Sequence, residues 1–167
     1  FILVATQLSD ALSEIHHERI IHKDLHPGNI LICPENGVVQ IIDFGLSSLL
    51  PREQPALKPP EQIEGVLNYI SPEQTGRMNR GLDYRSDFYS LGVTFYELLT
   101  GELPFNDEDI LATVHMHIAK QQKSVSAIRY NAPEALSQII NKLMAKSAED
   151  RYQNALGLKY DLEKAFD

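Results

Sequence analysis

Two short stretches decide how this sequence folds: His22–Asn29, which reads HKDLHPGN, and Asp43–Gly45, which reads DFG. The first holds a carboxylate, Asp24, and an amide, Asn29. The second holds another carboxylate, Asp43, fourteen residues after Asn29. Singly, each of these side chains is better explained as a turn or capping residue. Their joint spacing favours one shared site.

The sequence between the two stretches predicts a β-hairpin. Residues 30–33 and 38–42 are rich in β-branched side chains, and residues 34–37, which join them, read PENG, a strong turn signal. Such a hairpin places Asn29 just before its first strand and Asp43 just after its second. These two strand ends are neighbours in space, so both side chains can bind one metal ion.

Two carboxylates and an amide carbonyl on loops beside short strands are what phosphoryl transfer from a nucleotide requires. Asp24 can orient and deprotonate a hydroxyl group, while oxygen atoms of Asn29 and Asp43 hold Mg²⁺ against the phosphates. The sequence therefore predicts a phosphotransfer site at the edge of the hairpin.

The composition indicates one globular domain and argues against several classes of protein. The 167 residues are 43% hydrophobic and 23% charged, enough for a real core. A net charge of −8 argues against a nucleic-acid-binding surface. The single Cys33, expected to be buried and unreactive, excludes an internal disulfide and fits a cytoplasmic location. No membrane-spanning segment is predicted, and the apolar start Phe1–Ala5 leads us to expect a piece of a longer protein.

Outside the hairpin the hydrophobic periodicity is mostly helical. The expected elements are a helix within 1–18, a short strand at 19–21, a buried helix over 86–100 ended by Gly101, and helices that begin at 106, at Pro133 and after Asn154. The last of these should turn Leu158, Leu162 and Phe166 inward. Residues 47–65, with four prolines, should form a long loop. The predicted fold class is mainly α with a small β-hairpin.

Together these features resemble the C-terminal lobe of a protein serine/threonine kinase domain, nearly end to end. The further segments that carry the resemblance are GVLNYISPE at 65–73, SDFYSLG at 86–92, LPF at 103–105 and DRY at 150–152. The residues at 71–80 and 83–90 resemble a smaller group within that family. This group is the large bacterial multi-sensor signal-transduction serine/threonine kinases, in which ATPase and sensor modules accompany the kinase domain.

The resemblance implies how the chain is divided. Residues 1–21 would be a helix leading to the catalytic loop, 22–45 the catalytic loop, hairpin and metal motif, 46–73 the activation segment, and 86–167 a helical subdomain. The N-terminal lobe of the α+β kinase fold, with its Gly-rich loop and strand lysine, is absent from these residues. We therefore expect the 167 residues alone neither to bind ATP tightly nor to transfer phosphate. They should also expose the apolar surface that the other lobe would cover.

The resemblance also implies roles for individual residues. The expected catalytic residues are Asp24, as the base, Lys23 and His26. The expected ATP-binding residues are Asn29 and Asp43, as Mg²⁺ ligands, and Leu31, beneath the adenine. Those expected to support the structure are His22, Phe44, Gly45, Glu73, Asp87 and Arg151. Asp87 would accept backbone N–H groups of the catalytic loop, and Glu73 would form a buried ion pair with Arg151.

Three positions depart from the family's pattern, and the second and third of them lie near the acceptor. Lys23 stands where Arg is usual, His26 replaces a Lys that meets the γ-phosphate, and Val66 replaces a Thr. Lys keeps the charge of Arg but loses its bidentate fork, and His is charged only part of the time at neutral pH.

The activation segment also lacks acceptors for regulatory phosphate. Between Leu49 and Asn68 there is no Ser, Thr or Tyr, and only Ser47, Ser48 and Tyr69 bracket the segment. We therefore expect Lys23 to pair, if at all, with a fixed acid, and activity to be set by attached modules. The candidate acids are Glu53, Glu61 and Glu64.

Two alternatives stay open beside an ATP- and Mg²⁺-dependent kinase acting on protein hydroxyls in signal transduction. Residues 25–31 also read like the loop of small-molecule phosphotransferases related to aminoglycoside and choline kinases, which should lack the 71–73 segment, Asp87 and Arg151. His26 and Val66 motivate a catalytically silent pseudokinase, against which the intact base and metal ligands weigh.

The remaining histidines raise the question of a zinc site. His16, His17, His115 and His117 are not accompanied by Cys or acidic residues at ligand spacing. We expect them to be surface or interface histidines.

Overall fold

The computed structural model describes residues 1–50, 64–78 and 80–165. Within this part of the chain the helices are α1 (Ile2–His17), α2 (Arg85–Thr100), α3 (Ile110–Ala119), α4 (Val125–Ile128), α5 (Glu134–Leu143) and α6 (Ala155–Lys164). Strand β1 (Ile20–Ile21) pairs antiparallel with β4 (Ser48–Leu49), and β2 (Ile30–Ile32) pairs antiparallel with β3 (Val39–Ile41). The prediction of a mainly α fold with a small hairpin is confirmed.

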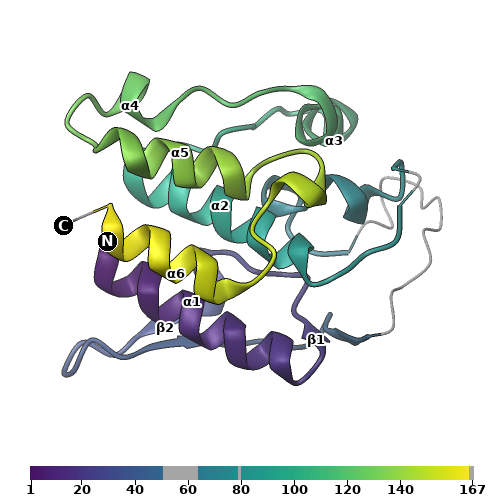
Figure 1. Cartoon of the computed structure of the whole chain (residues 1–167). Helices are drawn as coiled ribbons and strands as arrows, with labels where there is room; N and C mark the ends of the chain where they lie inside the picture. Colours follow the sequence, from purple (N-terminus) through teal and green to yellow (C-terminus); the bar gives the residue numbers. More distant parts are fainter. Residues whose placement is uncertain (51–63, 79, 166–167) are drawn as a thin grey trace.

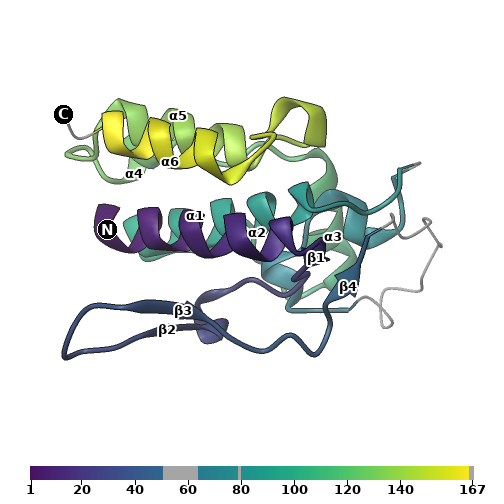
Figure 2. The ribbon, with the colours of Figure 1, turned by 60° about the horizontal axis from the view of Figure 1, so that its bottom comes forward.

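The helices pack as pairs, α1 along α6 and α2 along α5 (Figure 1). Figure 2 shows α5 and α6 on one side of the α1–α2 layer and the β2–β3 hairpin on the other. Helix α2 is the buried central helix that the sequence predicts, with Phe88, Leu91 and Phe95 fully buried. It ends at Gly101, whose φ of 76° suits glycine.

Helices α2 and α5 come into direct contact at Gly92. A Cβ atom on Gly92 would lie 2.7 Å from Cβ of Leu143 and 2.8 Å from Cγ of Met144. Only a hydrogen atom fits there. The contact fixes the end of α5. Residues 145–151, which follow it, include the cationic side chains of Lys146 and Arg151.

N-cap residues mark where α3 and α6 begin, and α3 begins later than the sequence predicts. Helix α3 begins at Ile110, not at 106, because Asp109 is its N-cap and its side chain accepts the N–H of Leu111. Asn154 caps α6 in the same way. Leu158 and Leu162 are buried as predicted, and Phe166 lies outside the described residues.

Three further expectations are corrected. Cys33 follows the end of β2, is half-buried and donates its thiol hydrogen to Glu35, so the prediction that it is buried was wrong. His117 is fully buried, and the side chain of His16 is only 10% exposed, so two of the four histidines are not at the surface. The short strand expected at 19–21 is present as β1, but its partner β4 was missed, because a two-residue strand carries no periodicity.

The search for membrane spans gives a simple result. Of the helices in the described part of the chain, none is long and apolar enough to cross a bilayer.

Candidate active site

The hairpin places the two proposed metal ligands as its turn and strands predict. The N–H of Ile42 donates to the carbonyl oxygen of Asn29 at 3.0 Å, which extends the β2–β3 ladder by one pair. Asn29 therefore lies opposite the residue that precedes Asp43. A short 3₁₀ turn, Pro27–Asn29, leads into β2, and His26 caps it through Nδ1, which accepts the N–H of Gly28.

The carboxylate of Asp24 is held from two sides. Its Oδ1 accepts the N–H of Val66 at 3.0 Å, and Nδ2 of Asn29 donates to Asp24 Oδ2 at 3.2 Å and to its main-chain oxygen at 2.9 Å. Gly65 has a φ of 94°, and a Cβ there would lie 3.0 Å from Asp24 Oδ1. Glycine thus allows the activation segment to approach the catalytic loop.

The contact from Val66 changes the meaning of one departure from the family's pattern. Position 66 has lost the Thr hydroxyl, but its main-chain N–H donates directly to Asp24. The sequence reading considered only the side chain and missed this donor. Any residue other than proline supplies an N–H, so no sequence signal could have revealed it.

The donor atoms fit a magnesium ion. The amide nitrogen of Asn29 is used by Asp24, which leaves its carbonyl oxygen as the free end of the amide. Asp43 is exposed, with φ 63°, and uses Oδ1 to accept the N–H of Gly45. In the described residues no group of three or more His, Cys, Asp or Glu could hold a metal. Mg²⁺ at this place would take its other ligands from phosphate and water, as this ion usually does.

His22 joins the catalytic loop to the end of β3. Its Nδ1 lies 3.3 Å from the N–H of Asp24, which it accepts, so Nε2 carries the hydrogen that is donated to the carbonyl of Ile42 at 3.0 Å. The ring of Phe44 packs edge-on against His22, with centroids 4.9 Å apart. Phe44 and Leu31 remain 42% and 50% exposed, so apolar surface lies bare beside the proposed nucleotide site.

Asp87 anchors the backbone of the catalytic loop, as expected. It is fully buried, and its two oxygens accept the N–H groups of His22 and Lys23 at 3.0 and 2.9 Å. Lys23 has φ 69°, a strained conformation that costs about 1–3 kcal/mol unless neighbours hold it. Gln74 supplies the second hold by donating to the carbonyl of Lys23 at 2.7 Å.

His16 is a supporting residue that the sequence reading missed. Its Nε2 lies 2.9 Å from Oδ2 of Asp87, and its ring packs against Phe88. The signal was available, since His16 precedes β1 at the end of α1 and the same helix leads into the loop.

Lys23 is near one of the three acids proposed for it. Its Nζ lies 3.9 Å from Oε2 of Glu64, at the outer limit of an ion pair. The other candidates, Glu53 and Glu61, lie outside the described residues.

The hydroxyl groups that bracket the activation segment are already engaged or buried. Ser47 donates to the carbonyl of Phe44, and Ser48 Oγ is buried without a hydrogen-bond partner among the described residues. Tyr69 donates to Glu97 at 2.5 Å; burial and this contact raise the pKa of Tyr69.

His26 lies beside Asp24 as well as capping its turn. Its Nε2 is 3.7 Å from Oδ2 of Asp24, and its ring centroid is 5.6 Å from that of Tyr69. The proposed catalytic role of His26 stays a prediction, since the structure shows a cap and a neighbour of the base.

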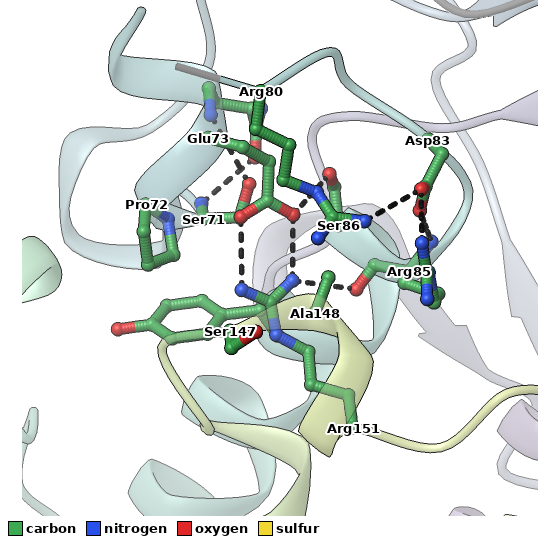
Figure 3. Close-up of polar contacts among 12 residues, drawn as sticks. Ser71, Pro72, Glu73, Arg80, Asp83, Arg85, Ser86, Ser147, Ala148 and Arg151 are labelled. Carbon is green, nitrogen blue, oxygen red and sulfur yellow. Dashed lines mark hydrogen bonds and ion pairs between the residues drawn. The ribbon is translucent and has the colours of Figure 1, made fainter. Parts of the chain in front are cut away.

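The predicted ion pair at the far end of the activation segment is present (Figure 3). Arg151 Nη1 and Nη2 lie 2.6 and 2.9 Å from the two carboxylate oxygens of Glu73, and both side chains are almost fully buried. Burial alone would raise the pKa of Glu73, but the hydrogen bonds and charge of Arg151 and the hydroxyl of Ser86 hold it below its usual value. The pair ties the end of the activation segment to the chain between α5 and α6.

A second ionic cluster borders this pair and was not predicted. Arg80 and Arg85 both contact Asp83, as Figure 3 shows, and both also contact Glu149. Burial alone would raise the pKa of Asp83, but its bonds to Arg85 hold it at about 2. The cluster links the loop before α2 to the turn that precedes Arg151.

Comparison with known families now decides the class of protein. Residues 2–160 match the protein kinase domain family. The chain belongs to this family. Its helical, kinase-like C-terminal lobe agrees with that assignment, while the roles of its individual residues stay predictions.

Relatives of this kinase chain include serine/threonine kinases of bacteria. Serine/threonine-protein kinase Pkn1 of Myxococcus xanthus is 37% identical over 165 residues, 97% of this chain and 23% of Pkn1. PknB of Mycobacterium tuberculosis (strain ATCC 25177 / H37Ra) is 34% identical over 159 residues, 95% of this chain and 25% of PknB. Hybrid signal transduction histidine kinase G of Dictyostelium discoideum is 56% identical over 95 residues, 57% of this chain and 3% of that protein. The chain thus spans a quarter or less of these relatives' lengths.

Proposed function

We propose that this chain is the catalytic-lobe portion of an ATP-dependent protein serine/threonine kinase, which transfers the γ-phosphate of Mg-ATP to a protein hydroxyl in signal transduction. The observation that carries the proposal is the placement of Asp24. Its carboxylate is fixed between Asn29 and Val66, at the hairpin end where Asp43 follows the second strand.

Each of these residues has a distinct task in the proposed reaction. Mg-ATP, when bound, supplies the phosphoryl group and neutralises part of its charge. Asp24 orients the acceptor hydroxyl and accepts its proton, and the hydrogen bonds at both carboxylate oxygens keep it in one rotamer. The amide oxygen of Asn29 and the carboxylate of Asp43 would hold Mg²⁺.

Two observations favour this function over the alternatives. The landmarks that small-molecule phosphotransferases should lack, Asp87 and the Glu73–Arg151 pair, are present and buried. The N–H of Val66 offsets the missing Thr hydroxyl, which removes one reason for a silent pseudokinase.

Phosphotransfer by the full-length protein tests the proposal. We expect labelled γ-phosphate to reach a protein acceptor and not choline or an aminoglycoside. Asp24→Asn and Asp43→Asn should each lower the rate by about 10²–10⁴, while Asp10→Asn, at a partly exposed residue of α1, should leave it unchanged. Transfer to the small alcohols alone, or full activity of Asp24→Asn, would contradict it.

The described residues supply one face of a nucleotide site. Leu31 is half exposed and Asp43 is exposed, whereas Asn29 is buried behind them. We infer that the 167 residues alone do not bind Mg-ATP at micromolar concentration. Calorimetry with this chain measures the affinity directly, and a micromolar value would contradict the inference.

We also propose a setting for this kinase lobe. The four-part division of the chain, attached sensor or ATPase modules and a cytoplasmic location complete the proposal. Its support is the similarity to a segment of hybrid signal transduction histidine kinase G and the single cysteine.

Control of the kinase without activation-segment phosphate is a separate proposal. The bracketing hydroxyls of Ser47, Ser48 and Tyr69 are engaged or buried, and Glu64 lies near Lys23. Treatment of the active full-length protein with a phosphatase should therefore leave its activity unchanged. Loss of activity on this treatment would refute the proposal.

A further inference from the structure

The peptide group between Lys23 and Asp24 lies directly before the proposed base and is held at both of its polar atoms. Its carbonyl oxygen, on Lys23, accepts a hydrogen bond from Nε2 of Gln74 at 2.7 Å. Its N–H, on Asp24, donates to Nδ1 of His22 at 3.3 Å. Because a peptide group is planar, contacts at both atoms fix the orientation of the whole group.

The backbone of this loop needs such contacts. Lys23 has φ 69°, in the left-handed region, a conformation that persists only when neighbouring groups hold it. Asp87 accepts the N–H groups of His22 and Lys23 and so holds the two preceding peptide groups. Gln74 holds the carbonyl oxygen of the next one. Rotation of that peptide group changes φ of Asp24 and thereby redirects its carboxylate.

The side-chain amide of Gln74 can be oriented in one way only. Its Oε1 accepts the main-chain N–H of Ser71 at 2.9 Å, and its Nε2 donates to the Lys23 carbonyl. A main-chain N–H only donates and a carbonyl oxygen only accepts, so exchanging the two ends of the amide would break both bonds. The Ser71 bond is half of a capping box, in which Ser71 Oγ accepts the N–H of Gln74. Gln74 therefore closes its own turn with one end of its amide and holds the catalytic loop with the other.

The turn that carries Gln74 is fixed to the rest of the fold. It is the 3₁₀ turn Pro72–Thr75, which begins with the capping box. Glu73, the residue before Gln74, forms the buried bidentate ion pair with Arg151. A buried pair of this kind is costly to break. Gln74 therefore reaches Lys23 from a rigid support.

We propose that Gln74 is a positioning residue for Asp24: its amide fixes the peptide group before the base, so the direction of the Asp24 carboxylate depends on the turn Pro72–Thr75. Because Glu73 belongs to the same turn, the placement of the base also depends on the ion pair with Arg151. Only the effect on phosphoryl transfer rests on the proposed kinase function.

Two substitutions separate this role from that of a helix cap. Gln74→Glu keeps an acceptor for the N–H of Ser71, as Glu does in an ordinary capping box, but its carboxylate cannot donate to the Lys23 carbonyl. Gln74→Met keeps the length of the side chain and loses both bonds. A residue that only caps the turn would tolerate Glu and not Met, whereas a positioning residue tolerates neither. Gln138→Glu, the same change at an exposed residue of α5, is the matched control.

The contact is tested by amide hydrogen exchange of the full-length protein. In Gln74→Glu the amide of Asp24 should exchange about tenfold faster, the factor for one lost hydrogen bond, while the amide of Ser71 keeps its protection. In Gln74→Met both amides should exchange faster, and in Gln138→Glu neither should change. Unchanged exchange at Asp24 in Gln74→Glu, or an equal loss of protection at Asp24 and Ser71 in that variant, would overturn the proposal.

The consequence for catalysis is measured on the same variants. Gln74→Glu and Gln74→Met should each lower kcat about tenfold and leave KM for ATP unchanged, because Gln74 acts on the base and not on the proposed metal ligands. Gln138→Glu should leave both values unchanged. Full activity of Gln74→Glu, or a loss that shows only as a higher KM for ATP, would overturn the positioning role. If the unaltered protein transfers no phosphate, the proposed function fails, and the exchange results still decide on Gln74.

Discussion

At the hairpin edge Leu31, Asp43 and Phe44 lie exposed, whereas the segment from Val66 to Glu73 is tied into the core at both ends. Val66 reaches Asp24 at one end, and Glu73 reaches Arg151 at the other. The acceptor side is therefore built from contacts within this chain. The proposed nucleotide side leaves the carboxylate of Asp43 and the apolar side chains of Leu31 and Phe44 exposed. Substitutions on the two sides should differ accordingly in their effect on stability.

The largest effect is expected at the buried ion pair. Arg151→Ala leaves the carboxylate of Glu73 buried without its partner and should lower the free energy of unfolding by about 3–5 kcal/mol. Chemical denaturation of the purified chain measures this. Lys159→Ala, which breaks a partly exposed ion pair with Asp10, is the control and should cost about 1 kcal/mol or less. Equal losses in the two variants would mean that burial of the Glu73–Arg151 pair adds nothing to its effect on stability.

A smaller effect should appear as pH falls. Burial and the charge of Lys146 lower the pKa of His117 from 6.5 to about 3 in the fold, so below pH 6.5 the unfolded chain binds a proton that the folded chain does not. Stability should therefore fall by about 1.4 kcal/mol for each pH unit, or about 2 kcal/mol between pH 6.5 and 5.

The measurement is a series of denaturation curves over this interval. His117→Gln should flatten the pH dependence. The lowered carboxylate pKa values of Glu73 and Asp83 act only below their ordinary values and so do not enter this range. A variant as steep as the unaltered chain would mean that another group carries the effect.

The smallest effect is expected at the hairpin edge. Leu31→Ala removes a side chain that is half exposed and should change the stability by about 0.5 kcal/mol. Leu25→Ala, in the neighbouring catalytic loop but fully buried, should cost about 2–5 kcal/mol. Thermal denaturation of both variants gives the comparison. A large loss for Leu31→Ala would mean that the edge is already part of the core.

The parts that could be predicted from sequence are those with local rules. The hairpin around Asn29 and the central helix α2 follow from turn chemistry and periodicity, whereas the Glu73–Arg151 pair was expected only from the family resemblance. The hydrogen bond from the N–H of Val66 could not be predicted, because nearly every residue has a main-chain N–H. Strand β4 could not be predicted, because two residues are too few to show a periodic pattern. His117 was misplaced because spacing on a helix does not tell which side is covered by a segment fifty residues earlier in the chain.

The absence of Ser, Thr and Tyr between Leu49 and Asn68 bears on how long a regulatory state can persist. A regulatory phosphate is added and removed by enzymes. It stays on the protein after the stimulus has ended, until a phosphatase removes it. The carboxylate of Glu64 near Lys23 is present from synthesis onward and no phosphatase removes it. This stretch therefore offers no Ser, Thr or Tyr hydroxyl on which such a phosphate could persist. In the proposed kinase, a signal that acts through this stretch would therefore last only as long as a partner stays bound.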